Sequence, residues 1–322
     1  MSDITTLNDM FPRNGMHEII REFCGKKWLS KKHTIRIESN GYREYVYLDN
    51  PLVLARLAGH VKHNLGQPIK GYQIFMRGQP NDYPGMVPSI FRNIPKMSNN
   101  YKNRVNAYND LIHRLREMKN LKRFKGPIGG ALLQHYGIRT PWIDLVDNLF
   151  IALWFATRER SQKEPFRYVK KSEKDYGWIY FIQVEDPPNK KFAQEGEGII
   201  TGKRTMWCDL RCYQTSLSLR AHTQHGIFAS RNGWGETNYD LDEFVVATVK
   251  FPITSAFTQT SDFNIFSMGY MFPSPYYDHT YKILKKGEVS TLIYNTERDN
   301  DLDEGELGSI YKYVSYRKQY VI

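Results

Sequence analysis

The sequence predicts an α/β protein of the α+β type, a single mixed domain with a central, largely antiparallel sheet flanked by helices, plus an N-terminal extension. Apolar segments of strand-like composition, such as 178–182 and 244–251, are interspersed with segments of helical periodicity, such as 104–122. No repeat, low-complexity tract or clear linker divides the 322 residues, and 41% hydrophobic content suffices for a packed core. We expect residues 1–70 to form the extension, packed on a main domain of residues 71–322.

The extension contains signals for a hairpin followed by a helix. Apolar residues alternate weakly on both sides of Asn40-Gly41, a dipeptide that favours a tight hairpin turn. Asn50-Pro51 predicts a helix start, because Asn is a good N-cap and proline suits the first helical position. The expected apolar face of this helix is Leu52, Leu57 and Val61.

In the middle of the chain, a strand is predicted over 72–77 and a helix over 104–122. We expect Gly78 to end the strand, because glycine allows the backbone to turn or to approach a ligand closely. Residues 126–130 have the composition of a loop, and a short helix over 131–136 should follow, closed by a glycine.

The second half is predicted to contain further helices and two buried strands. Asp147 or Asn148 should cap a mostly apolar helix that runs to about residue 160. The strand over 178–182 should end at the following prolines, and the strand over 244–251 is rich in β-branched residues. A last helix is expected over 275–287.

Separated short motifs place polar groups within apolar sequence. A buried polar group must be hydrogen-bonded or used, so such groups indicate a site or a structural network. The motifs are Phe75-Met76-Arg77-Gly78-Gln79, Pro88-Ser89-Ile90-Phe91-Arg92, Gln134-His135-Tyr136-Gly137 with Thr140 and Asp144, the apolar 148–156, and Thr223-Gln224-His225-Gly226-Ile227-Phe228.

The order and content of these motifs resemble the FRG domain, a family named for an aromatic-Arg-Gly motif at a strand end. The resemblance covers about residues 72–228. Three positions depart from the family pattern: Met76 stands where the aromatic is usual, Pro141 where an Arg is usual, and Leu145 where a Trp is frequent.

The Arg-Gly at an early strand end also looks like the first motif of ADP-ribosyltransferases. In that superfamily an Arg or His there holds NAD, a Ser/Thr motif follows, and an acidic or variant residue comes late. The resemblance implies that NAD is the substrate. It implies NAD-binding roles for Arg77, Gly78, Gln79 and Thr140, and puts Gln224 at roughly the late position with Glu236 nearby, although the usual late Glu is not evident. His135 and Asp144 are further catalytic candidates from their own chemistry, and Asp144 can orient a histidine or hold Arg77.

Each polar residue also has a structural interpretation. Arg77 can grip phosphate oxygens with its planar fork of donors, or form a buried bridge with Asp144. His135 can act as acid, base or orienting donor, or be a core histidine bonded to a backbone carbonyl. Gln224 can bind a ribose hydroxyl or amide, or cap a strand end.

The charge of the chain favours a polyanionic partner. Net charge is +11 and the isoelectric point is about 9.3. We expect nucleic acid to be that partner, with RNA favoured over duplex DNA because unpaired bases are accessible. The densest basic stretch lies at the end of the predicted helix over 104–122, where its residues either contact phosphates or form a solvated face. It comprises Arg114, Arg116, Lys119, Lys122 and Arg123.

Several classes of function lack their motifs. The sequence has no phosphate loop, no glycine fingerprint of a dinucleotide-binding domain and no Gly-x-Ser-x-Gly elbow. Its three cysteines do not suggest a disulfide scaffold or a zinc site, and no metal is expected. The acidic segment 297–306 lacks the glycine and glutamate of a calcium loop. No apolar run of about 20 residues occurs, so we expect no membrane association, and a cytoplasmic location.

Two classes of function remain. The first is an NAD-dependent, ADP-ribosyltransferase-like toxin or defence effector that modifies nucleic acid and has a cognate antitoxin or inhibitor protein. The second is a non-catalytic FRG-type module that binds a nucleotide-like ligand or a partner protein.

Overall fold

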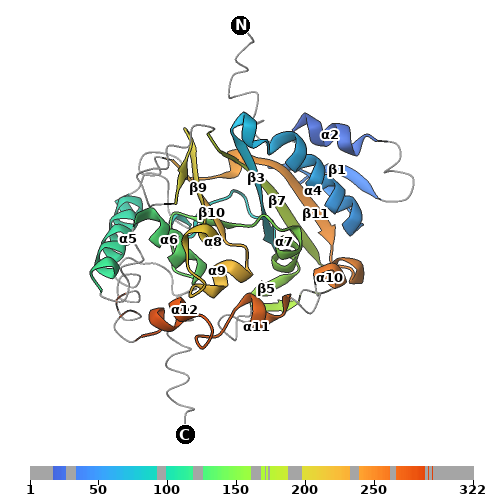
Figure 1. Cartoon of the computed structure of the whole chain (residues 1–322). Helices are drawn as coiled ribbons and strands as arrows, with labels where there is room; N and C mark the ends of the chain where they lie inside the picture. The colour runs from blue at the N-terminus through green and yellow to red at the C-terminus, as the bar shows by residue number, and fades with distance from the viewer. Residues whose placement is uncertain are drawn as a thin grey trace.

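The computed structural model describes most of the chain as one mixed α/β domain (Figure 1). The residues described are 17–26, 34–92, 99–118, 126–160, 168–170, 172, 175–187, 198–232, 239–261, 266–286, 289 and 292. They form a five-stranded sheet, a four-stranded sheet and a two-stranded ribbon, mostly antiparallel, with helices packed around them, which confirms the predicted fold class.

The larger sheet has five strands in the order β1-β2-β11-β7-β3. They are β1 (Ile35–Ser39), β2 (Glu44–Leu48), β11 (Val245–Pro252), β7 (Tyr176–Glu185) and β3 (Tyr72–Gln79). Of the four neighbouring pairs only β2–β11 is parallel. The predicted hairpin is confirmed, and Gly41 adopts a φ of 92° in its turn.

The N-terminal region contributes directly to this sheet. The strands β1 and β2 extend it beyond β11, while α2 (Glu18–Cys24) and α4 (Pro51–Leu65) pack beside them. The Asn50 side chain accepts hydrogen bonds from the amides of Leu52 and Val53, which confirms the predicted N-cap. The predicted apolar face is wrong at Leu52, which is 75% exposed, because the buried face turns toward Val53 and Leu54.

The smaller sheet has the order β4-β10-β9-β8, and a backbone bridge joins it to the larger one. Its strands are β4 (Ile143–Leu145), β10 (Ile227–Arg231), β9 (Thr205–Asp209) and β8 (Ile200–Thr201). Met76 on β3 exchanges two backbone hydrogen bonds of 2.8 Å with Val146, the residue after β4. This bridge brings the two sheet edges together where the polar motifs occur.

Hydrophobic clusters separate the layers. One fills the face of the larger sheet that is covered by α4, α7 (Leu149–Ala156) and α10 (Ser255–Ser261). A second lies between the two sheets and includes Phe75 and Trp207, whose rings are 5.0 Å apart. A third joins α5 (Asn99–Glu117), α6 (Gly126–His135) and α12 (His279–Leu284) to the smaller sheet.

The prediction that Gly78 ends the strand is wrong, because Gly78 lies within β3. A Cβ at this position would come within 1.8 Å of the Ala152 carbonyl oxygen on α7. The glycine is therefore required because helix and strand backbones approach closely.

Further boundaries differ from the predictions. The helix expected over 104–122 is α5, which begins at Asn99 and ends at Glu117. Residues 126–130, predicted as a loop, belong to α6; its Gly130 leaves room for the Tyr108 hydroxyl, which a Cβ would approach to 1.7 Å. The helix capped by Asn148 stops at Ala156, and β5 (Arg158–Arg160) follows and pairs with β6 (Tyr168–Lys170). The expected helix over 275–287 is the shorter α12, because Asp278 caps it.

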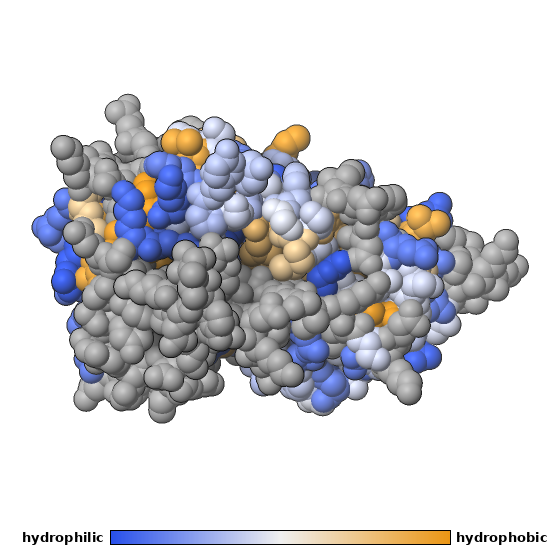
Figure 2. Space-filling model, turned by 90° about the horizontal axis from the view of Figure 1, so that it is seen from below, coloured by the Kyte–Doolittle hydropathy of each residue, from blue (hydrophilic) through white to orange (hydrophobic). Residues whose placement is uncertain are grey.

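The face seen from below in Figure 2 is mainly hydrophilic where it is coloured, with small separated hydrophobic groups. Within the described ranges, no helix is long and apolar enough to span a bilayer.

Candidate functional site

A cavity of about 210 Å³ lies where the two sheets meet. Its wall is formed by the end of β3, by α6, by β4 and by the turn between α9 (Leu219–Thr223) and β10. The predicted residues Arg77, Gly78, His135, Asp144 and Gln224 all line it. Although these residues span about half of the chain, the bridge between β3 and β4 brings them together.

Arg77 and Asp144 face each other across the bridge. The Arg77 Nη1 donates a 2.7 Å hydrogen bond to the Asp144 carbonyl oxygen and lies 4.0 Å from the carboxylate Oδ2. The Arg77 side chain is 18% exposed and that of Asp144 39% exposed. Arg77 thus makes the predicted contact with Asp144, and its side chain also lines the cavity.

Asp144 also contacts α6. Its Oδ1 lies 3.6 Å from His135 Nδ1, and its Oδ2 accepts a 3.0 Å hydrogen bond from Gln134 Nε2. Burial would raise the pKa of Asp144, but the neighbouring His135 and Arg77 outweigh burial and lower this pKa below its ordinary value. Asp144 is therefore an anion at neutral pH.

His135 is buried, with only 3% of its side chain exposed. Its Nδ1 faces Asp144, and Nε2 has no hydrogen-bond partner among the described residues. The ring also lies against Gly226, where a Cβ would be 3.2 Å from the His135 Cε1. The backbone carbonyl partner that a core histidine would have is not present for Nε2 in the described part of the chain. Because His135 lines the cavity, a ligand there has access to a ring that Asp144 orients.

The Gln134 side chain links three of the predicted motif residues, Ser89, Thr140 and Asp144. Its Oε1 accepts hydrogen bonds from the hydroxyls of Ser89, at 3.1 Å, and Thr140, at 2.9 Å. Thr140 is fully buried and does not line the cavity, so its hydroxyl positions Gln134 and thereby Asp144.

Two further arginines line the cavity: Arg92, which belongs to a predicted motif but was given no role of its own, and Arg220, which the sequence reasoning missed. Arg92 follows the 3-10 helix η2 (Ser89–Phe91), and Arg220 lies on α9 and is 2% exposed. The Arg220 guanidinium lies 4.7 Å from the Tyr136 ring centre and 5.2 Å from that of Phe272, and it donates to the His135 carbonyl oxygen. Its partners are distant in sequence, so no local motif marks it.

Two phenylalanines also line the cavity. Phe155 on α7 and Phe272, just after α11 (Met268–Met271), both line the cavity, and their ring centres are 6.4 Å apart. Gln224 Nε2 donates a 2.5 Å hydrogen bond to the Met271 carbonyl oxygen and so fixes this segment beside α9. The cavity lining therefore includes both cationic and aromatic side chains.

A second polar network lies next to the cavity. The Asp147 carboxylate is 2.8 Å from His225 Nδ1 and 2.8 Å from Arg211 Nη2, and Arg211 also pairs with Asp209. Burial opposes ionisation, but His225 and Arg211 lower the pKa of Asp147 well below its ordinary range. His225 adopts a φ of 51°, which is uncommon for a residue with a side chain.

The other predicted residues do not join the cavity. Gln79 lies on β3 opposite Trp178, away from the lining. Arg114 and Arg116 are exposed on α5 and form no part of the wall. Glu236, Lys119, Lys122 and Arg123 lie outside the described residues. No cluster of three or more potential metal ligands is found in the ranges that are described.

One family model matches part of the chain. The model of the FRG domain matches residues 72–165, which include β3, η2, α6, β4 and α7. The matched segment carries Arg77, Arg92, His135 and Asp144, while Arg220 and Gln224 come from the later part of the chain. Neither the curated proteins nor the solved structures contain a significant match.

Proposed function

We propose that the cavity beside the segment matched by the FRG domain model, residues 72–165, binds a phosphate-bearing nucleotide, specifically NAD, and that the protein transfers ADP-ribose to a nucleic-acid base. One observation carries the proposal: Arg77, Arg92 and Arg220 line a cavity in which Asp144 is the one described carboxylate. RNA is the favoured acceptor.

The charge balance supports an anionic ligand. Three arginines line the cavity, and Asp144 is the one carboxylate among its described lining residues, so positive charge is in excess at the wall. Arg77 has a second feature that suits phosphate, since the planar fork of its guanidinium matches two phosphate oxygens. Asp278, which accepts hydrogen bonds from the Arg220 amide and the Tyr136 hydroxyl, lies behind the wall.

The aromatic side chains support a ligand that also carries a ring. Phe155 and Phe272 offer apolar surface within the same cavity as the arginines. Ligand pockets commonly enclose about 300–1,000 Å³. A cavity of about 210 Å³ is smaller, so we expect one phosphate-ribose or ring portion of NAD to enter it while the rest lies along the rim.

The proposed reaction requires few protein groups. The bond between nicotinamide and ribose C1′ breaks, and nicotinamide leaves with the bonding electron pair. A base nitrogen of the acceptor forms the new bond to C1′ and loses its proton. His135, oriented by Asp144, is the proposed proton acceptor, and Glu236 remains the second candidate. An enzyme of this kind would act as a toxin or defence effector and would require a cognate inhibitor protein.

A second candidate is a non-catalytic module that binds the same nucleotide. Asp144 favours it, because this carboxylate already contacts Arg77, Gln134 and His135. A carboxylate with these partners is suited to holding the cavity in shape.

The two candidates are separated by incubating the protein with NAD and total RNA and analysing the products by mass spectrometry. Transfer predicts release of nicotinamide and nucleosides heavier by one ADP-ribose, both lost in His135→Ala. Intact NAD, together with NAD binding, would assign the non-catalytic module. Intact NAD without binding would contradict both candidates.

A further inference from the structure

An aromatic and basic surface lies on the larger sheet, on strands that do not form the cavity wall. We call it the aromatic platform, and it comprises Arg36, Tyr45, Tyr47, Tyr176, Trp178 and Lys250. We propose that the aromatic platform binds single-stranded nucleic acid by stacking its unpaired bases. The proposal does not depend on NAD binding in the cavity.

Strand register places these side chains in one row. Arg36 pairs with Tyr47, Tyr47 with Lys250, and Lys250 with Trp178. Because side chains alternate along a strand, the intervening residues such as Val46 and Val249 belong to the core on the other face. Across four strands the row spans roughly 14 Å, enough for a few nucleotides.

The rings and cations of the row contact one another. The Arg36 guanidinium lies 4.3 Å from the Tyr47 ring centre, and the Lys250 ammonium lies 4.2 Å from that of Tyr176. The Tyr47 and Tyr176 rings are 6.4 Å apart at 66°. One face of each of these two rings is therefore covered by a cation, so a base would stack on the other face or displace the cation, which could then contact the phosphate.

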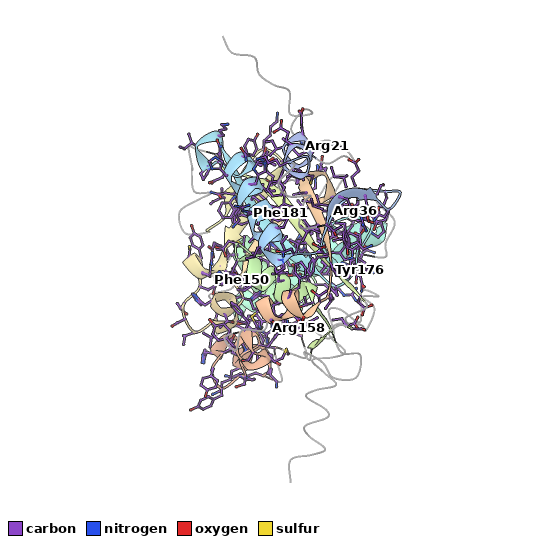
Figure 3. All side chains as sticks on the ribbon, turned by 90° about the vertical axis from the view of Figure 1, so that its right-hand side faces the viewer. Arg21, Arg36, Phe150, Arg158, Tyr176 and Phe181 are labelled. Carbon is purple, nitrogen blue, oxygen red and sulfur yellow. The ribbon has the colours of Figure 1, made fainter. Side chains whose placement is uncertain are left out.

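The platform is accessible at its outer end. Tyr176 is 41% exposed, and the side chain of Arg36 is 56% exposed. In Figure 3 Arg36 and Tyr176 lie at the same side of the molecule, and Phe150 on α7 lies at the other. Trp178 and Tyr45 are buried beneath Lys250, so they support the exposed rings.

The charge of the platform suits a polyanion. Burial and the neighbouring Glu38 raise the pKa of Tyr45 to about 12, and burial raises the pKa of Tyr47, so both rings are neutral at physiological pH. Glu38 hydrogen-bonds to Arg36 and Tyr45, and Lys250 is the second cation of the platform. The chain as a whole carries a net charge of +11.

This chemistry fits unpaired bases better than a duplex. Bases of single strands can be splayed onto aromatic side chains on a sheet, whereas a duplex hides their faces. The exposed Arg114 and Arg116 of α5 are a rival surface, because they can contact phosphates of either form.

The test measures fluorescence anisotropy of labelled oligo(U) and oligo(dT) of about ten nucleotides, a typical site size, with the full chain. The variant Arg36→Gln/Tyr176→Ala changes exposed side chains and should keep the fold. We expect it to weaken binding about 5- to 50-fold, because stacking on one ring and one cation is lost. Tyr176→Phe keeps the ring and should bind within about two-fold of wild type.

Two controls separate the alternatives. Tyr276 is 86% exposed and lies outside the platform, so the variant Tyr276→Ala should bind the oligonucleotides as tightly as the wild type. The proposal is overturned if the wild type binds neither oligonucleotide, or if it binds a duplex of equal length as tightly as the single strands. It is also overturned if Arg36→Gln/Tyr176→Ala binds the single strands as tightly as the wild type does. Loss of binding only in Arg114→Glu/Arg116→Glu would instead assign α5.

Discussion

At the scale of single residues, Asp147 shows how one carboxylate supports the region next to the cavity. It accepts from Arg211 and His225 and carries a lowered pKa. A carboxyl group whose pKa is lower in the folded state binds fewer protons there, so it stabilises the fold above its unfolded pKa. This stabilisation is lost as the pH falls through the interval below about 4, the ordinary value of Asp.

We therefore expect the free energy of unfolding of the wild type to fall more steeply below about pH 4 than that of Asp147→Asn. At neutral pH the variant should be less stable, because Arg211 and His225 lose an anionic partner. Urea unfolding at a series of pH values measures both effects. Parallel pH profiles for the two proteins would show that Asp147 has the same pKa in both states.

At the scale of elements, the packing of β3 against α7 determines where Arg77 lies. Gly78→Ala would place a Cβ 1.8 Å from the Ala152 carbonyl oxygen, so helix and strand must separate. We expect a loss of about 1–3 kcal/mol, the usual cost of overpacking, measured by urea unfolding.

Gly59→Ala is the matched control for this substitution. Gly59 lies within α4 with no atom within 4 Å of its added Cβ, so alanine should stabilise the helix by about 0.5–1 kcal/mol. Equal stability of Gly78→Ala and the wild type would mean that β3 and α7 are not in this close contact.

Elements marked by local signals could be predicted from the sequence. The hairpin at Asn40-Gly41, the cap at Asn50 and the apolar β7 depend on neighbouring residues alone. The start of α6 could not be predicted, because a segment with several glycines has the composition of a loop. The need for glycine at position 130 is explained only by Tyr108, which is distant in sequence.

The candidate site could be predicted in part, where its residues belong to local motifs. The motifs identified the polar residues at strand and helix ends, and Arg77, His135, Asp144 and Gln224 do line one cavity. Arg220 could not be identified, because it gains its role from contacts to Tyr136, Tyr281 and Phe272 that form only in the folded chain.

At the scale of the whole molecule, cavity and aromatic platform use different parts of the same sheet. The cavity forms at β3, where the larger sheet meets the smaller one, and the platform extends over β1, β2, β11 and β7. With bound NAD and bound single-stranded nucleic acid, one domain would hold donor and acceptor together. That arrangement depends on the cavity being a nucleotide-phosphate site.

Isothermal titration calorimetry of NAD into the wild type and Arg77→Lys tests this claim most directly. The lysine keeps the charge but loses the planar fork, so we expect NAD to bind the wild type and to bind the variant about ten-fold more weakly or worse, a difference of about 1.4 kcal/mol. Thermal unfolding without NAD should show that the variant is folded. Absence of NAD binding to the wild type, or equal affinity in the two proteins, would contradict the account.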